Sequence, residues 1–295
     1  MLRRLLALVL LFAFAPLARA DENPDWTTQL TPFRIADNLY YVGSRDLASY
    51  LITTPQGDIL INSNLESSVP QIRHSVEQLG FHWNDIKILL ISHVHFDHAA
   101  GSAAIVTQTH AKYMVMDGDV PVIESGGAKD FAYGPKPQYP PAHVDRTLHD
   151  GHTVTLGNVT LTAHKTAGHT RGCTTWTMRV HLPGEPASRL RNVVIVGSWN
   201  VNPGYRLVAS RARPASYPGI AQDFAHTFVV LNALPCDIFL GAHGMYFDML
   251  AKLARMPREG DMVWIDPDGY HRTVAERKAA FEKELHKQQA EASAR

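Results

Sequence analysis

The chain has 295 residues, of which 45% are hydrophobic, so it can form one large domain or two small ones. Its 28 basic and 28 acidic side chains balance, and no basic block stands out, which argues against a nucleic-acid partner. Beyond the first twenty residues no stretch approaches eighteen apolar residues, so the sequence predicts no transmembrane helix.

The first segment has the pattern of a secretory signal peptide. Two arginines precede the apolar run at 5–17, and Ala18-Arg19-Ala20 fits the small-x-small cleavage rule. We therefore predict a signal peptide at 1–20, cleaved after Ala20, and a single mature domain at 21–295. The residue directly after the predicted cut is Asp21 and not a cysteine, so a lipid anchor is not expected. We expect a mildly acidic periplasmic protein without membrane attachment.

Strand and helix patterns alternate along the mature chain. Short β-branched or aromatic runs predict strands, and apolar residues at helical spacing predict helices. The predicted strands are 39–43, 49–53, 58–62, 86–91, 112–116, 153–156, 159–163, 174–180, 193–196 and 237–240. The predicted helices are 69–79, 102–109, 118–125, 220–234, 246–254 and 273–287. Residues 126–144 show no period and predict a long surface loop. The order indicates an α/β sandwich, two β-rich halves faced by helices.

A cluster of metal-ligand side chains follows the buried strand predicted at 86–91. His93, His95, Asp97 and His98 fall within six positions. Residues two apart on an extended chain point to the same side, so His93 and His95 can face one point. Asp97 and His98 can then turn toward a second point. Imidazole and carboxylate suit zinc, with iron and manganese as lesser candidates. The alternative, a His-rich surface loop, does not explain four ligand types at the end of a buried strand.

Two later histidines stand in Gly-flanked loops beyond predicted strands. His169 follows Gly168, and His243 lies between Ala242 and Gly244. Either histidine alone is equally well explained as a structural residue. With the cluster they complete six ligands, enough for a binuclear site. His164 is a candidate for orienting one of the ligand imidazoles.

At this point the pattern resembles a known family. His-x-His-x-Asp-His at 93–98, Gly-His-Thr at 168–170 and the strand-end His243 resemble the metallo-β-lactamase superfamily. Ala-Gly-His-Thr at 167–170, Gly-Ser-Trp-Asn-Val-Asn-Pro-Gly-Tyr at 197–205 and Ala-Leu-Pro-Cys-Asp at 233–237 are similar to its third subclass, the B3 type. The likeness covers the chain from about Phe33 onward.

The resemblance implies a four-layered αββα sandwich with two Zn²⁺ at one edge of the two sheets. The first zinc would be held by His93, His95 and His169, and the second by Asp97, His98 and His243. Asp97 would also act in catalysis by orienting a zinc-bound hydroxide. The implied activity is hydrolysis of the β-lactam ring amide in penicillins, cephalosporins and carbapenems, which confers antibiotic resistance.

Substrate contacts are expected from two loops. Ser198 and Asn200 are placed to meet the substrate carboxylate, and Phe131 to cover its apolar face, although Phe131 is explained as well by packing of its own loop. Ser198 stands where other members carry a zinc-binding cysteine or a metal-bridging aspartate. The β-lactam is the expected partner, and we expect a monomer.

The sequence departs from the family at two points and leaves two questions about its cysteines open. Asn62 replaces an aspartate that many members carry at the end of the third strand. No cysteine follows Cys236, so the C-terminal disulfide of several members cannot form. Cys173 and Cys236 can still pair with each other, which the sequence does not decide. Cys173 is either a soft metal ligand or a small buried residue, and we favour the second.

Two other functions compete with the lactamase reading. A hydrolase of the same fold can act on a thioester or a homoserine lactone, but the export signal and Ser198 argue against it. A closed structural zinc module or a nuclease is the third possibility. Ligand positions left open for water, together with the mildly acidic charge, argue against both.

Overall fold

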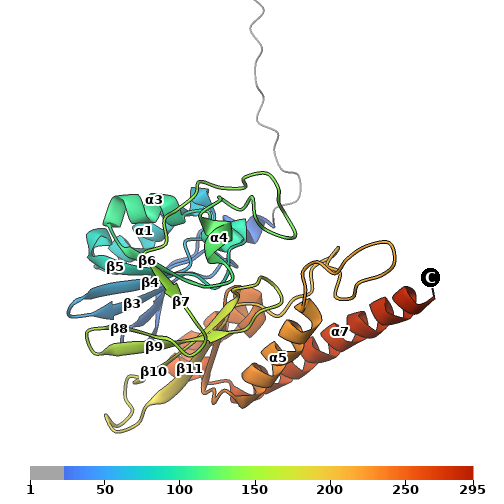
Figure 1. Ribbon diagram of the computed structural model, residues 1–295. Helices are drawn as coiled ribbons and strands as arrows, with labels where there is room; N and C mark the ends of the chain where they lie inside the picture. The colour runs from blue at the N-terminus through green and yellow to red at the C-terminus, as the bar shows by residue number, and fades with distance from the viewer. Residues whose placement is uncertain (1–22, 295) are drawn as a thin grey trace, which may run out of the picture.

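Two β-sheets lie face to face, and helices cover their outer sides (Figure 1). The computed structural model describes residues 23–294, so the signal peptide predicted at 1–20 lies outside the described residues. Helices α1 (Val69–Gln78) and α3 (Ser102–Thr109) lie over the first sheet. Helices α5 (Ile220–Ala233) and α7 (Pro267–Ser293) lie side by side on the other side of the molecule. The predicted four-layered αββα sandwich is confirmed.

The first sheet has seven strands in sequence order. They are β1 (Phe33–Ala36), β2 (Leu39–Tyr41), β3 (Tyr50–Thr54), β4 (Gly57–Ile61), β5 (Ile86–Leu90), β6 (Lys112–Met116) and β7 (Arg146–Leu148). Strands β1 to β4 form an antiparallel meander, whereas β4 to β7 run parallel. Parallel neighbours need crossover connections, and the helices between them supply these.

The second sheet has five strands in the order β12-β11-β10-β9-β8. They are β8 (Thr153–Leu156), β9 (Val159–Lys165), β10 (Thr174–Val180), β11 (Arg191–Val196) and β12 (Ile238–Gly241). Only the β11–β12 pair is parallel. The α-helices are α1 (Val69–Gln78), α2 (Phe96–Ala99), α3 (Ser102–Thr109), α4 (Val120–Ile123), α5 (Ile220–Ala233), α6 (Met249–Glu259) and α7 (Pro267–Ser293).

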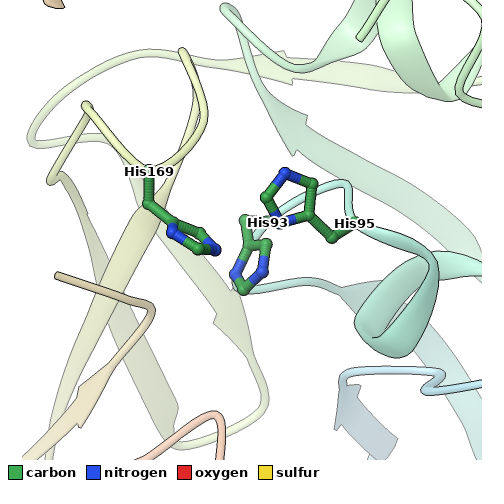
Figure 2. Close-up of side chains that lie close together, drawn as sticks. All are labelled: His93, His95 and His169. Atoms are coloured by element: carbon green, nitrogen blue, oxygen red, sulfur yellow. The ribbon is translucent and has the colours of Figure 1, made fainter. Parts of the chain in front are cut away.

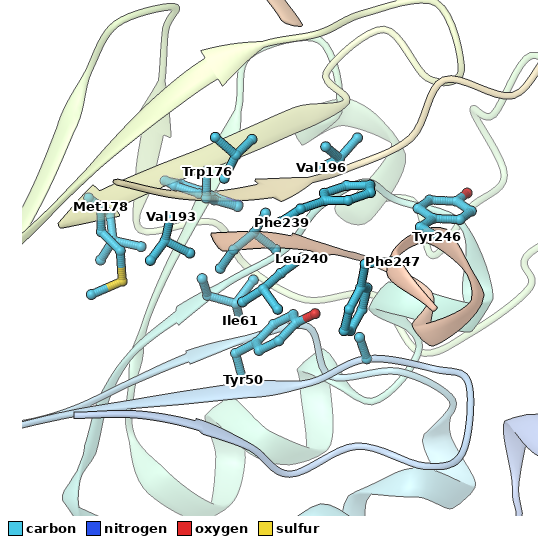
Figure 3. Close-up of a cluster of buried hydrophobic side chains, with 14 of the residues drawn as sticks. Tyr50, Ile61, Trp176, Met178, Val193, Val196, Phe239, Leu240, Tyr246 and Phe247 are labelled. Carbon is cyan, nitrogen blue, oxygen red and sulfur yellow. The ribbon is translucent and has the colours of Figure 1, made fainter. Parts of the chain in front are cut away.

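The main apolar core fills the space between the sheets. Figure 3 shows Tyr50 and Ile61 of the first sheet facing Trp176 and Leu240 of the second. Two buried hydrogen bonds join the sheets within this core. The Tyr50 hydroxyl donates to the carbonyl of Gly241 at 2.7 Å, and Trp176 Nε1 donates to the carbonyl of Ile91 at 3.1 Å. Both bonds end beside the chain segments that carry the histidine cluster and His243, so they fix the two sheets relative to each other there.

Several predicted bounds were wrong. The helix predicted at 118–125 is the single turn α4, and the helix predicted at 246–254 is interrupted at Asp248, whose φ of 53° separates a 3₁₀ turn (Gly244–Phe247) from α6. The helix predicted at 273–287 is longer, because Asp266 caps it by accepting from Gly269 N and Pro267 occupies its first turn. Strands β1 and β7 were not predicted. Among residues 23–294, no helix combines the length and apolarity that crossing a bilayer requires.

Candidate metal centre

The candidate ligands lie in loops at one edge of the sandwich. Strand β5 ends at Leu90, and the following loop is fixed before His93 because Asn62 Oδ1 accepts from Ser92 N at 2.7 Å. Asn62 Nδ2 donates to the carbonyl of Ala48 at 3.1 Å, so both ends of this side chain hold backbone groups. Asp97 and His98 follow on the single-turn helix α2, where the His98 ring lies beside His93 with centroids 4.4 Å apart.

The other two histidines come from the second sheet. His169 lies in the connection between β9 and β10, and His243 lies two residues after the end of β12. Gly168 has a φ of +129°, and a Cβ there would lie 2.6 Å from the ring of Phe224 on α5. Only glycine therefore allows this loop to turn His169 toward the first sheet while packing on α5.

Three imidazoles form the first group of ligands. The rings of His93, His95 and His169 point toward one another (Figure 2), with centroids 4.6 to 4.9 Å apart. Each offers a nitrogen within 4.8 Å of the others, and all three side chains are buried. Three neutral nitrogens converging on one point are the donor set of a zinc site with a position left open.

Asp97, His98 and His243 form the second group. Asp97 Oδ2 lies 3.3 Å from His98 Nε2 and 3.6 Å from His243 Nε2, and the two Nε2 atoms are 3.1 Å apart. Ligand atoms about 2.0–2.1 Å from a tetrahedral ion are about 3.3 Å from one another, so this triangle has the size that zinc requires. His93 offers a ligand atom within 4.8 Å of Asp97 and His98 too, which makes the two groups adjacent.

Hydrogen bonds on the outer side of the rings select the nitrogen that faces the cluster. His169 Nδ1 donates to the carbonyl of Asn200 at 2.8 Å, and His243 Nδ1 donates to Asp46 Oδ2 at 2.9 Å. In both rings Nε2 is thereby left as the nitrogen that faces the cluster. These bonds fix ring orientation and tautomer before any ion binds.

The electrostatics keep the site ready for a cation. Burial lowers the pKa of His95 to about 4 and that of His169 to about 3, with further lowering by neighbouring imidazoles, so both rings are neutral at pH 7. Burial alone would raise the pKa of Asp97, but His98 and His243 hold it below its ordinary value. Neutral imidazoles and an ionised carboxylate are the metal-binding forms. Moreover, His93 Nδ1 is buried without a hydrogen-bond partner among the described residues. The residues present therefore fit a metal.

The site opens into a cavity of about 270 Å³. Among the described residues its lining includes no lysine or arginine, so neutral groups and a bound cation would have to attract an anionic substrate. Trp26, Tyr133 and Met245 supply apolar wall, and Asn200 and Asn202 supply amides. A larger hollow of about 1080 Å³ lies elsewhere, around Gln56 and Arg179, and contains none of the six candidate ligands.

The predicted substrate residues are only partly at the cavity surface. Asn200 lines it, whereas Ser198 is buried behind it, with Oγ 3.3 Å from the hydroxyl of Tyr246. Phe131 does not line the cavity, because its ring packs against Tyr205 and Tyr217. Its loop instead presents Tyr133 there.

Two secondary assignments can now be decided. The proposed orienting role of His164 was wrong, since its Nε2 hydrogen-bonds Thr177 Oγ1 across β9 and β10 and contacts no candidate ligand. Cys173 belongs to neither ligand group and is a buried residue whose thiol donates to the carbonyl of Ser198. Cys173 and Cys236 are both free and buried.

Sequence reasoning missed the residues that orient the ligands. Asp46 accepts hydrogen bonds from His243, from Trp26 Nε1 and from Met245 N, and these keep its pKa low although burial would raise it. Asp130 Oδ2 and the Tyr205 hydroxyl lie 3.6 and 3.5 Å from His95 Nε2. Each is an isolated polar residue far along the chain from its partner, and no local motif marks it.

Comparisons with known proteins agree with this geometry. Residues 45–180 match the model of the "Metallo-beta-lactamase superfamily". Native FEZ-1 metallo-beta-lactamase from Legionella gormanii is 50% identical, with a TM-score of 0.83 over 89% of this chain and 98% of that one. BJP-1, a subclass B3 metallo-beta-lactamase of Bradyrhizobium japonicum, is 35% identical, with a TM-score of 0.81 over 90% and 98%.

Two further relatives widen the comparison. The class B3 di-zinc metallo-beta-lactamase LRA-12 from an Alaskan soil metagenome is 35% identical, with a TM-score of 0.80 over 89% of this chain and 97% of that one. A "Probable metallo-hydrolase" of Burkholderia pseudomallei is 30% identical over 110 residues, which span 37% of this chain and only 36% of that protein.

Proposed function

The chain belongs to the metallo-beta-lactamase superfamily, and from this premise we propose that it is a zinc-dependent β-lactamase of the B3 type. It hydrolyses the amide of the β-lactam ring in penicillins, cephalosporins and carbapenems and so confers antibiotic resistance. The observation that carries this proposal is the pair of adjacent ligand triads opening on one cavity, in a chain 50% identical to a metallo-beta-lactamase.

We assign two zinc ions to the two triads. His93, His95 and His169 would hold one ion, and Asp97, His98 and His243 the other. Bound zinc would supply a Lewis acid and lower the pKa of water toward about 7, which provides a nucleophile at neutral pH. No basic side chain is then needed to generate it.

Asp97 has the best-defined role among the side chains. Its carboxylate is ionised, and Oδ2 lies within 3.6 Å of both His98 Nε2 and His243 Nε2. A carboxylate so placed can accept a hydrogen bond from the attacking water and orient it toward the substrate carbonyl. We assign Asp97 as the catalytic residue.

Asn200 is the proposed contact for the substrate carboxylate. Its Nδ2 donates to the hydroxyl of Tyr246 at 3.0 Å at the cavity wall, and its backbone N donates to Ser198 Oγ at 3.4 Å. Ser198 thus supports Asn200 from behind. Phe131 acts indirectly, because its ring packs against Tyr205, whose hydroxyl donates to the carbonyl of His169 at 2.8 Å.

We further propose that residues 1–20 direct export and that the enzyme works in the periplasm as a monomer. The β-lactam would be its only partner, with no nucleic acid and no membrane attachment. A lactamase in the periplasm can hydrolyse a β-lactam in the compartment that the antibiotic enters first.

A substrate panel tests the proposal. Purified protein with zinc is offered a penicillin, a cephalosporin, imipenem, an acyl-glutathione thioester and a homoserine lactone, and hydrolysis is followed by absorbance. We expect at least one β-lactam to be cleaved with kcat/KM above about 10⁴ M⁻¹s⁻¹, in the ordinary range of enzymes, and the other two classes at least about a hundredfold more slowly. Preferred cleavage of the thioester or the lactone would overturn the assignment.

A further inference from the structure

A carboxylate outside both ligand triads joins the two chain segments that form the first one. Asp119 is 1% exposed and stands at the start of α4, yet its side chain makes no capping hydrogen bond. An aspartate at this position ordinarily accepts from the first turn of its own helix. Here the carboxylate is turned toward two loops of the metal centre instead.

Three donors from these loops converge on the Asp119 carboxylate. Oδ2 accepts from Val94 N at 3.2 Å and from Thr170 Oγ1 at 2.7 Å, while Oδ1 accepts from Gly172 N at 2.7 Å. Val94 lies between His93 and His95 in the sequence, and Thr170 directly follows His169. One side chain therefore connects the loop that carries two ligands with the loop that carries the third.

The backbone is shaped to allow this connection. A Cβ on Gly118 would lie 2.3 Å from the carbonyl oxygen of Arg171, and a Cβ on Gly172 would lie 2.6 Å from the backbone N of Asp119. Any other residue at either position would push the turn at 117–119 away from the loop after His169. The two glycines therefore permit a close approach of these segments that a side chain at either position would prevent.

We infer that Asp119 is a positioning residue that sets the spacing of His93, His95 and His169 and thereby the affinity of the first metal position. All three of its partners are donors, so a carboxylate satisfies them and an amide does not. Among the described residues, the Asp119 carboxylate makes no hydrogen bond to a member of the second triad, and His243 of that triad is held by Asp46 instead. The inference rests on the metal assignment proposed above, but not on the substrate.

The test measures zinc affinity at each position separately, by competition with a chromophoric chelator. His243→Ala removes a ligand of the second triad, so the zinc affinity measured in this variant is that of the first position. His169→Ala removes a ligand of the first triad, so the affinity measured there is that of the second position. In the His243→Ala background, Asp119→Asn should weaken zinc binding by about 10- to 100-fold, the range expected when a supporting partner is lost. In the His169→Ala background the same substitution should change it by less than about threefold.

A matched control and a milder variant complete the design. Asp117→Asn alters a carboxylate in the same turn that bonds Lys165 and His149 instead, and it should leave both affinities unchanged. Thr170→Val removes one donor at nearly constant volume, and in the His243→Ala background it should weaken binding by about tenfold or less. This variant keeps the inference testable if Asp119→Asn does not fold.

Two results would overturn the inference. Equal loss at both positions would show that Asp119 only stabilises the fold, and unchanged affinity at the first position would show that the connection does not matter. Because zinc affinity is read without any β-lactam, absence of lactamase activity would reject the proposed function and leave this measurement valid.

Discussion

Two candidate ligand imidazoles face the metal centre on one side and are held by a hydrogen-bond partner on the other. His243 is held by Asp46 and His169 by the carbonyl of Asn200, so each ring is ordered before an ion arrives. Preorganisation of this kind lowers the entropy that metal binding must overcome.

Replacing Asp97 by asparagine tests its catalytic role. We expect kcat for imipenem to fall by at least about 100-fold, because an amide neither orients the water nor binds metal as a carboxylate does. The urea unfolding midpoint of the metal-free protein should change little. His164→Gln is a matched control on the sheet and should retain activity. Activity near that of the wild type in the Asp97 variant would exclude the assigned role.

Replacing Asp46 by asparagine tests the outer partner of His243. Asparagine keeps an acceptor oxygen but loses the charge that supports the imidazole, so zinc at the second position should bind about tenfold more weakly. Chelator competition measures the change. Trp26→Phe, which removes only the indole donor to Asp46, should have a smaller effect. A greater loss of zinc affinity in Trp26→Phe than in Asp46→Asn would contradict the assigned role of Asp46.

The sequence reveals the inner residues of the site far better than the outer ones. His93, His95, Asp97 and His98 lie together after a buried strand, and His169 and His243 follow Gly-marked strand ends, so local pattern was enough. The spacings to the outer partners are 197 residues for Asp46 with His243 and 25 residues for Asp119 with Val94. Such pairings exist only in the folded chain.

At the scale of elements, the C-terminal helix α7 supports the substrate side of the cavity. The Gln288 amide accepts from Leu207 N at 2.7 Å and donates to the carbonyl of Tyr205 at 2.9 Å. The segment it holds continues from Asn200 and Asn202, which line the cavity. A helix far from the ligands in the sequence thus holds the loop that is proposed to meet the substrate.

Removing the Gln288 side chain tests this support. Gln288→Ala loses the two hydrogen bonds to this segment and a third to Glu284. Each is worth about 1 kcal/mol, and the freed loop should raise KM for imipenem about 3- to 10-fold. Zinc affinity should stay the same, because the ligands lie elsewhere. Gln289→Ala, an exposed neighbour, is the control. An unchanged KM, or a loss of zinc instead, would contradict the proposed support.

The elements themselves were predicted unevenly, and the reasons are physical. The start of α7 was marked by Asp266-Pro267, a capping residue followed by the proline that suits a first turn, and the prediction passed over this signal. Strand β7 has three residues and one buried side chain, too few for a pattern. The break at Asp248 depends on a left-handed backbone conformation that the local sequence does not mark.

For the whole molecule, the buried imidazoles couple stability to pH. The pKa of His95 is about 4 and that of His169 about 3 in the fold, against an ordinary value near 6.5 in the unfolded chain. As the pH falls through 6.5, the unfolded chain takes up protons that the native imidazoles do not. Their contribution to stability is therefore complete above about pH 6.5 and is lost as the pH falls toward 4.

Urea unfolding of the metal-free protein at pH 7.5, 6 and 5 measures this coupling. We expect the free energy of unfolding to fall toward pH 5, by up to about 1.4 kcal/mol per pH unit for each such histidine. A His95→Gln, His169→Gln double variant should show a flatter profile. A wild-type profile that is already flat would contradict the neutral, buried state of these rings.

The most direct test of the whole account follows imipenem hydrolysis while the number of zinc ions per chain is varied. The purified protein is freed of metal with a chelator, zinc is returned in steps, and turnover and bound zinc are measured on the same samples. The account predicts no turnover without metal and full recovery as the bound zinc approaches two per chain. Turnover that persists in the metal-free protein, or that fails to return with both triads loaded, would contradict it.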